Sequence, residues 1–423
     1  MFALVDANSF YCSAETVFRP DLRDKPIIVL SNNDGCIVAV NRRAKDLGVP
    51  KFSPYFKIKA ECEAKGVIAF SSNYELYSDL SAKMMNVIGR FAPEQFVYSI
   101  DESFLSFQRA YPAIPCLKKH GEELRKAVWK ETRLPVCVGF GSTLTLAKMA
   151  NHLAKKIRSF NGVCVLDDQS KTLELLKNVD VDVDVDDVWG IGRKLSKRMQ
   201  FMGINTAYDL AKYPVGLLRK DFNVEVERTA RELNGQICKG WELVKANKQQ
   251  IYSTRSVGER ITDVESLRQA LVKHAGITSR KLREQRSLTK IMLCFAASSP
   301  FDEKPASFKT IHRFSFPTSD VTHLSQVASN AADELFREGV RFYKIGVGLL
   351  DLSDGTMHQL DMLNENPSNE KLNAVFDGLN RKYGTDAVFI AAQGIKQEWS
   401  MKRQFLSKQY TTKWSDLPKI SCS

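Results

Sequence analysis

The chain has 423 residues, 43% hydrophobic and 26% charged, which is ordinary for a globular protein of about two to four domains. Its net charge of +12 favours a polyanionic partner without distinguishing DNA from RNA, and neither a membrane span of about 20 apolar residues nor a signal peptide is expected. The nine cysteines are scattered without Cys-x-x-Cys or zinc-type His spacing, which argues against disulfides and zinc and favours a reducing cytoplasm.

A short apolar strand, Met1–Val5, is the first predicted element and leads into Asp6. A carboxylate at a strand end is the kind of hard oxygen ligand that Mg²⁺ prefers. With acids from a neighbouring strand it would hold two divalent ions roughly 3.5–4 Å apart for an in-line phosphoryl displacement. Asp6 is therefore a candidate ligand if partner acids follow later in the chain.

A hairpin and a short helix come next. Two apolar runs, Pro26–Leu30 and Cys36–Val40, flank an Asp-Gly pair and predict a β-hairpin. The helix should begin after Asn41 as its N-cap. Its bases, which otherwise form a solvated helix face, are Arg42, Arg43 and Lys45.

Residues 74–166 alternate helical and strand patterns. The expected helices are Tyr74–Phe91, Leu117–Glu131 and Thr143–Lys156, and the expected strands include Pro135–Phe140 and Gly162–Leu166. This order favours helices packed on one face of an antiparallel or mixed sheet.

An adjacent acid pair lies within Tyr98–Phe107. Asp101 and Glu102 stand between apolar and aromatic residues of high strand propensity, where a purely structural strand would avoid buried charge. Side chains alternate across a strand, so both acids serve one site only if the chain turns there. We expect a tight hairpin with the acids at its bend; the alternative is an exposed turn with two solvated acids.

A glycine-rich turn introduces the next helices. The preceding Val179–Asp187 lacks the Gly and Glu of a calcium loop and is expected to be a solvated acidic connector. Trp189–Arg193 should open a helix, and a further helix should follow from Thr206. Glycines permit close backbone approach, and amides at a helix N-terminus bind phosphate without reading sequence. The pattern resembles a helix-hairpin-helix.

A second α+β unit follows. Between Arg280 and Lys290, five bases accompany Glu284 alone, which predicts a basic edge. Its expected elements are strands at 253–260, 291–297, 309–316 and 344–351, and helices at 267–282 and 324–336. After it we expect a polar loop at 353–370, a helix at 371–383 and a basic tail at 396–423.

The acid motifs together resemble the Y-family (translesion) DNA polymerases. Asp6-x-x-x-Phe10-Tyr11 followed by Ser99-Ile100-Asp101-Glu102 is similar to that family's catalytic signature. The resemblance extends over essentially the whole chain. Further similar segments are Phe18–Leu22, Ser31–Cys36, Ser71–Tyr77 and Asp187–Gly192.

The resemblance implies an α+β, multidomain, right-hand polymerase with small fingers and a little finger. The fingers are too short for the long closing helix of replicative polymerases. The implied boundaries are palm 1–8 and 74–166, fingers 9–73, helix-hairpin-helix thumb 167–236, linker 237–250, little finger 251–352 and C-terminal tail 353–423.

The resemblance also implies residue roles. Asp6, Asp101 and Glu102 would hold two Mg²⁺ ions and catalyse nucleotidyl transfer. Tyr11 would lie beneath the incoming sugar and exclude a 2′-hydroxyl. The expected triphosphate contacts are Phe10, Tyr11, Lys45 and Lys155, and the expected DNA-backbone contacts are Gly190, Ile191 and Gly192. Lys155 lies in the last turn of its predicted helix, where a positive charge interacts favourably with the helix dipole even without this role.

The implied partners are primer–template DNA, deoxynucleoside triphosphates, a processed UmuD dimer, RecA and the sliding clamp. The segment Gln359–Leu363, through Gln359, Leu360, Met362 and Leu363, resembles a bacterial clamp-binding motif, although the segment ends in Leu where Phe is common. The implied setting is error-prone synthesis past damaged bases in the bacterial SOS response, in the cytoplasm at the nucleoid.

Two alternatives remain. A catalytically silent, polymerase-fold DNA-binding or regulatory subunit is opposed by the intact acid trio. A nucleotidyl cyclase or other two-metal enzyme with a similar palm is opposed by the thumb hairpin and the basic little finger.

Overall fold

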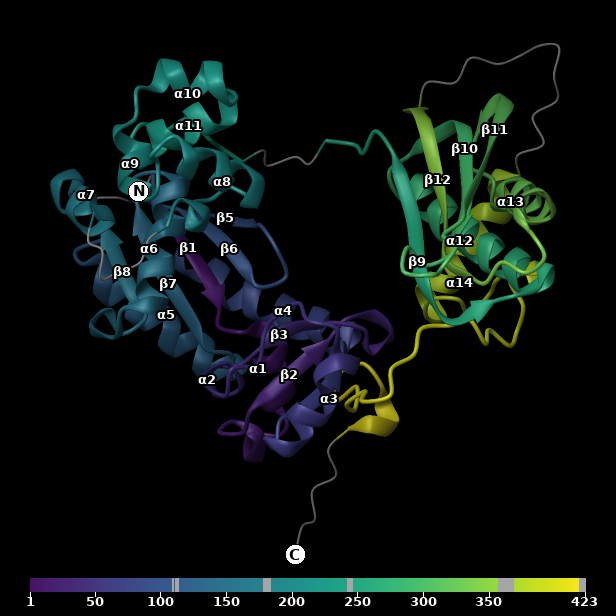
Figure 1. Cartoon of the computed structure of the whole chain (residues 1–423), viewed down its shortest axis with the longest axis horizontal. Coiled ribbons are helices and arrows are strands. Elements are labelled where there is room, and N and C mark those ends of the chain that lie inside the picture. Colours follow the sequence, from purple (N-terminus) through teal and green to yellow (C-terminus); the bar gives the residue numbers. More distant parts are fainter. Residues whose placement is uncertain (109, 111–113, 178–183, 242–245, 357–368, 418–423) are drawn as a thin grey trace, which may run out of the picture. The chain divides into compact units, whose positions relative to one another are not determined.

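The computed structural model describes residues 1–108, 110, 114–177, 184–241, 246–356 and 369–417 (Figure 1). The chain divides into two compact units, Met1–Val244 with Phe405–Ser423, and Lys245–Gln404. Within the described residues, no helix combines the length and apolar character needed to cross a bilayer. The described cysteines are free thiols.

A five-stranded mixed sheet forms the centre of the first unit, with β1 as its middle strand. Only β7 and β8 run parallel; the other neighbours are antiparallel. In spatial order the strands are β5 (Glu94–Val97), β6 (Glu102–Ser106), β1 (Phe2–Ala7), β7 (Val136–Gly141) and β8 (Val163–Leu166).

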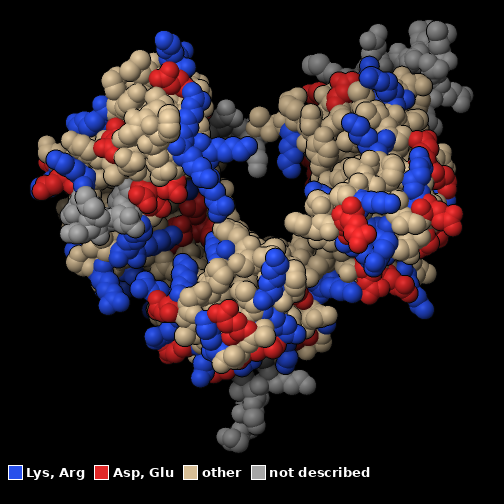
Figure 2. Space-filling model, in the orientation of Figure 1, with Lys and Arg blue, Asp and Glu red and all other residues tan. Residues whose placement is uncertain are grey.

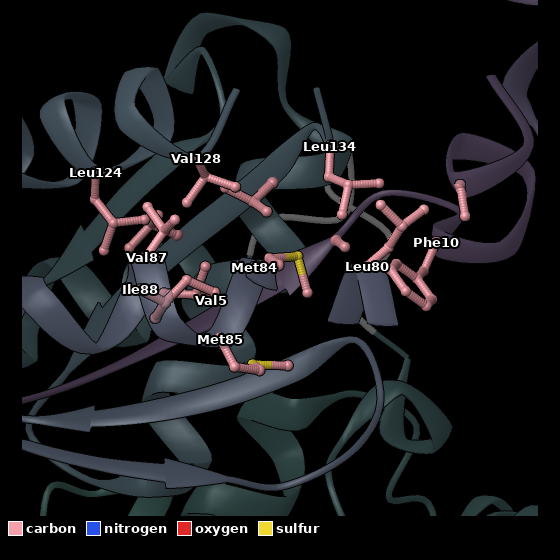
Figure 3. Close-up of a cluster of buried hydrophobic side chains, with 14 of the residues drawn as sticks. Val5, Phe10, Leu80, Met84, Met85, Val87, Ile88, Leu124, Val128 and Leu134 are labelled. Atoms are coloured by element: carbon pink, nitrogen blue, oxygen red, sulfur yellow. The ribbon is translucent and has the colours of Figure 1, made fainter. Parts of the chain in front are cut away.

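Helices cover both faces of this sheet, so the expectation of helices on one face is wrong. One face packs on α4 (Tyr74–Ile88) and α5 (Leu117–Thr132), and Val5 of β1 lies in that core (Figure 3). The other face packs on α6 (Leu144–Lys156) through Leu4 of β1. Consecutive residues of β1 are apolar, so both of its faces need cover.

The approach of α6 to the sheet depends on glycine. A Cβ placed on Gly139 of β7 would lie 2.0 Å from the backbone nitrogen of Asn151 and 2.6 Å from the carbonyl oxygen of Ala147. The buried Asn151 side chain donates to the carbonyls of Leu4 and Cys137, at 3.1 and 2.8 Å. These bonds tie α6 to β1 and β7, the strands beside the candidate site.

A three-stranded sheet, ordered β3-β2-β4, lies in the same unit. The predicted hairpin is confirmed, and Asn41 caps the following helix by accepting from the amide of Ala44 at 2.9 Å. The strands are β2 (Ile27–Leu30), β3 (Ile37–Val40) and β4 (Ile68–Ser71). The accompanying helices are α1 (Phe10–Val17), α2 (Arg42–Asp46) and α3 (Tyr55–Ala64).

Five short helices complete the main part of the first unit. The expected helix starts after the glycine-rich turn and at Thr206 are confirmed; Thr206 forms a reciprocal capping box with Asp209. The helices are α7 (Gln169–Lys177), α8 (Arg193–Phe201), α9 (Ala207–Lys212), α10 (Val215–Asp221) and α11 (Val224–Leu233).

In the described end of Val179–Asp187 the acids are exposed as expected, whereas Val185 is not part of a solvated connector. Val185 is fully buried in the core beneath the short helices, and Asp184 pairs with Thr206 in an antiparallel bridge. The apolar Val side chain gains more from this core than from water. Residues 179–183 lie outside the described part of the chain.

The second unit contains a four-stranded antiparallel sheet, ordered β11-β10-β12-β9. Two helices, α12 (Val264–Glu284) and α13 (Val321–Leu335), pack on one face through the buried alternate residues of the strands. The strands are longer than predicted: β9 (Ile251–Ile261), β10 (Ser287–Ala297), β11 (Ser307–Thr318) and β12 (Phe342–Asp354).

The region after residue 353 is not one separate tail. The helix α14 (Glu370–Tyr383) belongs to the second unit, where Trp399 is buried against the core. The chain then returns to the first unit at Phe405. One aromatic side chain anchors each part, because Trp399 packs into the core of the second unit and Phe405 against the core of the three-stranded sheet. The predicted motif at 359–363 lies outside the described residues.

The basic run on α12 is partly neutralised. Arg283 donates from Nε and Nη2 to both carboxylate oxygens of Asp377 on α14, each at 2.7 Å. Arg280 lies 3.9 Å from Glu284. Of the bases in the predicted basic edge, Arg283 is therefore engaged within the protein.

Candidate active site

Two of the three predicted acids lie side by side on neighbouring strands. Asp6 on β1 and Glu102 on β6 are directly opposite each other in the antiparallel register. Opposed residues of neighbouring strands project from the same face of a sheet. Asp101 precedes Glu102 in the hairpin turn, and its carbonyl accepts from the amide of Ala7 at 2.9 Å. The expected hairpin with its acids at the bend is confirmed.

The hairpin turn is held by Ser99. Its hydroxyl donates to Asp101 Oδ1 at 2.6 Å and accepts from the amides of Asp101 and Glu102, at 3.2 and 3.1 Å. Ser81 on α4 donates to the carbonyl of Ile100 at 2.6 Å. A turn fixed from within and from the helix behind it orients the Asp101 carboxylate.

Two lysines of α6 pair with the strand acids. Lys155 Nζ lies 2.6 Å from Asp6 Oδ1, and Lys148 Nζ lies 2.9 Å from Glu102 Oε1. The two lysines are seven residues apart and share one helix face, about 10.5 Å apart along the axis. The sequence pattern pointed to Lys155 but not to Lys148, because a lysine on an amphipathic helix is common and carries no signal of its own.

Asp6 is electrostatically unusual. The pKa of Asp6 is raised to about 6: burial is the largest cause, Lys155 opposes the rise, and the neighbouring carboxylates of Glu102 and Asp101 add to it. Mutual repulsion among carboxylates is relieved by positive charge. The three acids therefore form one electrostatic group that attracts cations.

Hard oxygen donors from neighbouring strands suit a divalent cation. In the described part of the chain, no three His, Cys, Asp or Glu side chains already converge around one ion position. The positive charges at two of these acids are instead the ammonium groups of Lys148 and Lys155. By the chemistry of its donors, the set of Asp6, Asp101 and Glu102 fits a divalent cation.

Tyr11 lies on α1 beside the acids. Its ring stacks on Tyr77, with centroids 4.6 Å apart and planes 18° from parallel, and meets the edge of Tyr74 at 6.3 Å. Burial raises the pKa of Tyr11, with further contributions from Tyr74 and Asp101, so Asp101 lies within electrostatic range. The side chain of Phe10 is buried in the core, which leaves only its backbone to face a ligand.

The predicted triphosphate contacts lie on three elements, with Phe10 and Tyr11 on α1, Lys45 on α2 and Lys155 on α6. Lys155 reaches Asp6, whereas Lys45 is an exposed residue in the last turn of α2. Arg42 lines a cavity of about 340 Å³ beside the β1–α1 loop. Our sequence reasoning did not associate Arg23, Arg43 and Arg133 with this cavity, which they also line.

The glycine-rich turn has the backbone that its sequence requires. Gly190 has φ of +91°, which disfavours other residues, and Gly192 is the N-cap of α8. A Cβ at Gly192 would meet nothing within 4 Å, so the amides at this end are approachable. Ile191 is buried and anchors the turn. Figure 2 shows lysine and arginine side chains gathered along the α8 side of this unit.

A cluster of aromatic rings joins the acid hairpin to the glycine-rich turn. Trp189 Nε1 donates to the Tyr98 hydroxyl at 3.3 Å, and the two rings meet edge to face at 5.8 Å. Lys148 Nζ lies over both rings, 4.7 Å from the Tyr98 centroid and 5.5 Å from that of Trp189. Lys148 thus links Glu102 to this aromatic support.

Family models match most of the chain. Residues 5–152 match the impB/mucB/samB family and residues 248–362 match its C-terminal domain. Residues 370–420 match a domain of unknown function, DUF4113.

Known proteins of similar sequence extend over the full length. Protein UmuC of Salmonella typhimurium is 42% identical over 99% of this chain and 100% of its own. Protein MucB of Escherichia coli is 39% identical, covering 99% of each chain. DNA polymerase IV 1 of Bacillus subtilis is 24% identical over 96% of each.

Solved structures share the fold at low sequence identity. A Y-family DNA polymerase chimera of Dbh and Dpo4 has a TM-score of 0.61 and 18% identity, over 83% of this chain and 99% of its own. An insertion ternary complex of Dbh DNA polymerase has a TM-score of 0.52 and 19% identity, over 82% and 98%.

Proposed function

Because the chain belongs to the impB/mucB/samB family of Y-family DNA polymerases, we propose that Asp6, Asp101 and Glu102 are the catalytic centre of a translesion enzyme. The enzyme is a DNA-directed DNA polymerase of the error-prone type. The observation that carries the assignment of the centre is the opposed pair Asp6 and Glu102, with Asp101 in the adjoining turn. Primer extension by carboxylate variants tests it.

The three carboxylates would hold two Mg²⁺ ions. Bound metal would activate the primer 3′-hydroxyl and stabilise the leaving pyrophosphate. The burial of Asp6 keeps its carboxylate poorly solvated and therefore receptive to a cation. Ser99 orients Asp101, while Lys148 and Lys155 supply positive charge at the edge of the site, where phosphate charge develops.

We propose the following division of the chain: palm 1–8 and 74–166, fingers 9–73, thumb 167–236 and little finger 251–352. The palm contains the five-stranded sheet, the fingers the three-stranded sheet and the little finger the four-stranded sheet. The amides of Gly190, Ile191 and Gly192 would bind a DNA phosphate, because α8 begins there with open space around its N-cap.

The little finger would bind duplex DNA through the sheet face opposite α12 and α13. On that face Arg313 and Lys309 of β11 and Lys344 of β12 are exposed, with Tyr252 and Ile311 beside them. Positive side chains on a sheet face track phosphates, and the protein needs no base contacts to hold the duplex.

Affinity for primer–template DNA should fall steeply with salt. With five or six phosphate contacts, the slope of log K against log[salt] is expected to be on the order of −5. Replacing Lys309, Arg313 and Lys344 with Ala should make it shallower by about 3 units, as measured by fluorescence anisotropy. A matched triple variant on α14, with Lys371, Arg381 and Lys382 changed to Ala, should keep the parent slope. Equal slopes for the two triple variants would show that this sheet face does not contact DNA.

Tyr11 would act as the sugar gate. Its ring stacks on Tyr77, meets the edge of Tyr74 and lies within electrostatic range of Asp101. A rigid aromatic beneath the incoming sugar leaves no room for a 2′-hydroxyl.

Replacing Tyr11 with Ala should admit ribonucleotides and largely spare deoxynucleotide insertion. The expected result is a fall of at least about 100-fold in the ratio of kcat/KM for deoxynucleotides to that for ribonucleotides, because a steric clash is removed. Single-nucleotide insertion with each substrate measures the ratio. Parent-like discrimination in this variant would make Tyr11 a packing residue.

The proposed partners are a processed UmuD dimer, RecA and the sliding clamp, in the SOS response at the nucleoid. Family membership supports them, and Gln359, Leu360, Met362 and Leu363 have the polar–apolar pattern of a peptide that enters an apolar groove. Weak clamp binding would raise the effective concentration of the enzyme at a primer end. Loss of clamp stimulation on changing Gln359, Leu360 and Leu363 to Ala tests this partner.

A further inference from the structure

The C-terminal segment that returns to the first unit docks on the edge of the three-stranded sheet. The Ser71 amide at the end of β4 donates to the carbonyl of Phe405 at 3.0 Å, and the Phe405 amide donates to Ser71 Oγ at 3.0 Å. The Phe405 ring meets the edge of Tyr55 at 5.9 Å, within the core of the sheet and α3. The segment therefore binds by backbone pairing and by an aromatic anchor.

The segment continues past the N-terminus of α4 and the C-terminus of α1. Asn73 Nδ2 donates to the carbonyls of Ser407 and Lys408, both at 3.3 Å. The ring of Tyr410 stacks on Phe18, with centroids 4.8 Å apart. Residues 405–410, which we call the C-terminal strap, are thus bound at several successive positions.

Ser407 is the polar centre of the strap. Its hydroxyl accepts from Asn73 Nδ2 at 2.9 Å and donates to the carboxylate of Glu15 on α1. Tyr77 of α4 donates from its hydroxyl to the same carboxylate at 2.6 Å. One serine hydroxyl thereby connects the end of the chain to both α1 and α4.

These groups are deeply buried, which makes their hydrogen bonds consequential. Asn73 and Tyr77 are fully buried and Glu15 is 2% exposed. Burial raises the pKa of Glu15 to about 7, and the bonds from Tyr77 and Ser407 oppose that rise. A buried carboxyl that loses one of its donors is left short of hydrogen bonds, and its neighbours shift to compensate.

The same network fixes the neighbours of Tyr11. Tyr77, whose hydroxyl binds Glu15, is the residue on which the Tyr11 ring stacks. Glu15 follows Tyr11 by four residues on α1 and so lies on the same helix face. Asn73, which binds Ser407, is the N-cap of α4, the helix that carries Tyr74 and Tyr77.

We propose that the C-terminal strap positions the sugar gate: Ser407, acting through Glu15 and Tyr77, sets the orientation of Tyr11 and hence discrimination between deoxyribonucleotides and ribonucleotides. Ser407 is a positioning residue that does not touch substrate. The inference rests on the proposed role of Tyr11, and it assigns a task to part of the region that matches DUF4113. A small displacement of a positioning contact is enough to change selectivity.

The test uses the full chain with Ser407→Ala, which removes the hydroxyl and leaves the aromatic anchors of the strap in place. We expect the ratio of kcat/KM for deoxynucleotides to that for ribonucleotides to fall about threefold to tenfold. Ser407→Thr retains a hydroxyl and should restore the ratio. Ser415→Ala is the matched control, because Ser415 is exposed and its hydroxyl donates to its neighbour Asp416 at 3.2 Å.

A ratio of two rates on one preparation cancels any loss of folded enzyme, so a strap that only stabilises the fold would leave it unchanged. An unchanged ratio for Ser407→Ala, with a collapsed ratio for Tyr11→Ala, would overturn the inference and leave the gate intact. An unchanged ratio for Tyr11→Ala would overturn the gate and the inference together. Equal falls in Ser407→Ala and Ser415→Ala would also overturn the inference.

Discussion

Replacing Asp101 with Asn should abolish primer extension in Mg²⁺ while leaving primer–template binding close to that of the parent chain. The amide keeps the size of the side chain but removes the charge that would hold a divalent ion. Loss of such charge stabilisation in a transition state is expected to cost at least about a thousandfold in rate. DNA affinity should persist, because the bases proposed to bind DNA, such as Arg313 and Lys344, lie in the other unit. Single-turnover insertion and anisotropy measure the two quantities.

Asp24→Asn is a control of the same chemistry. Its side chain is 90% exposed and pairs with Arg43 at 3.4 Å on the surface, so extension should be unchanged. Parent-like extension by the Asp101→Asn enzyme would exclude this carboxylate from the reaction. A parent chain that binds primer–template but never extends it would instead indicate a silent subunit, and template-independent turnover would indicate another two-metal enzyme.

Replacing Gly139 with Ala should strongly destabilise the first unit. The new methyl group would meet backbone atoms of α6 at 2.0 and 2.6 Å, and backbone cannot move aside as a flexible side chain does. The helix would have to leave β7 and break the bonds of Asn151 to both strands. We expect a loss of more than about 3 kcal/mol in the free energy of unfolding and a fall in Tm of roughly 10 °C.

Gly216→Ala provides the comparison. Gly216 lies in α10 with nothing within 4 Å of a new Cβ, so alanine should leave the Tm unchanged or raise it slightly. Calorimetry on both variants shows whether the loss of stability is specific to Gly139 or follows any change of glycine to alanine. A Gly139→Ala enzyme that melts with the parent would show that α6 does not lie this close to β7. The pairing of Lys148 and Lys155 with the acids depends on that approach.

Local patterns were enough to predict most elements of the fold. The Asp-Gly turn, the N-cap Asn41 and the acid pair between strand formers each express a preference of a few adjacent residues, and each prediction is confirmed. Layer arrangement was not predictable in the same way. The face on which α6 packs depends on Gly139 of β7 and on the apolar side chains that β1 places on both faces of the sheet. These features involve segments far apart in the sequence, so no local pattern reveals them.

The site shows the same limit. Asp6, Asp101 and Glu102 were identifiable because acids in apolar strands are costly and therefore informative. Lys148 was not identified, since a lysine on an amphipathic helix is common and only its distance to Glu102 distinguishes it. The division of the C-terminal region was also not predictable from local patterns. Its two parts differ in the core that their aromatic side chains contact, the second unit for Trp399 and the three-stranded sheet for Phe405.

The return of the chain at Phe405 has a consequence for the order in which this protein matures during synthesis. The bond between Phe405 and Ser71 joins residues 334 positions apart, with the whole second unit between them. A ribosome releases the acids, the strands around them and Tyr11 long before it releases the strap. The N-terminal unit therefore acquires its full set of contacts only after translation has passed Phe405 and the residues that follow it, so the surroundings of Glu15 and Tyr77 are completed later than those of the acids.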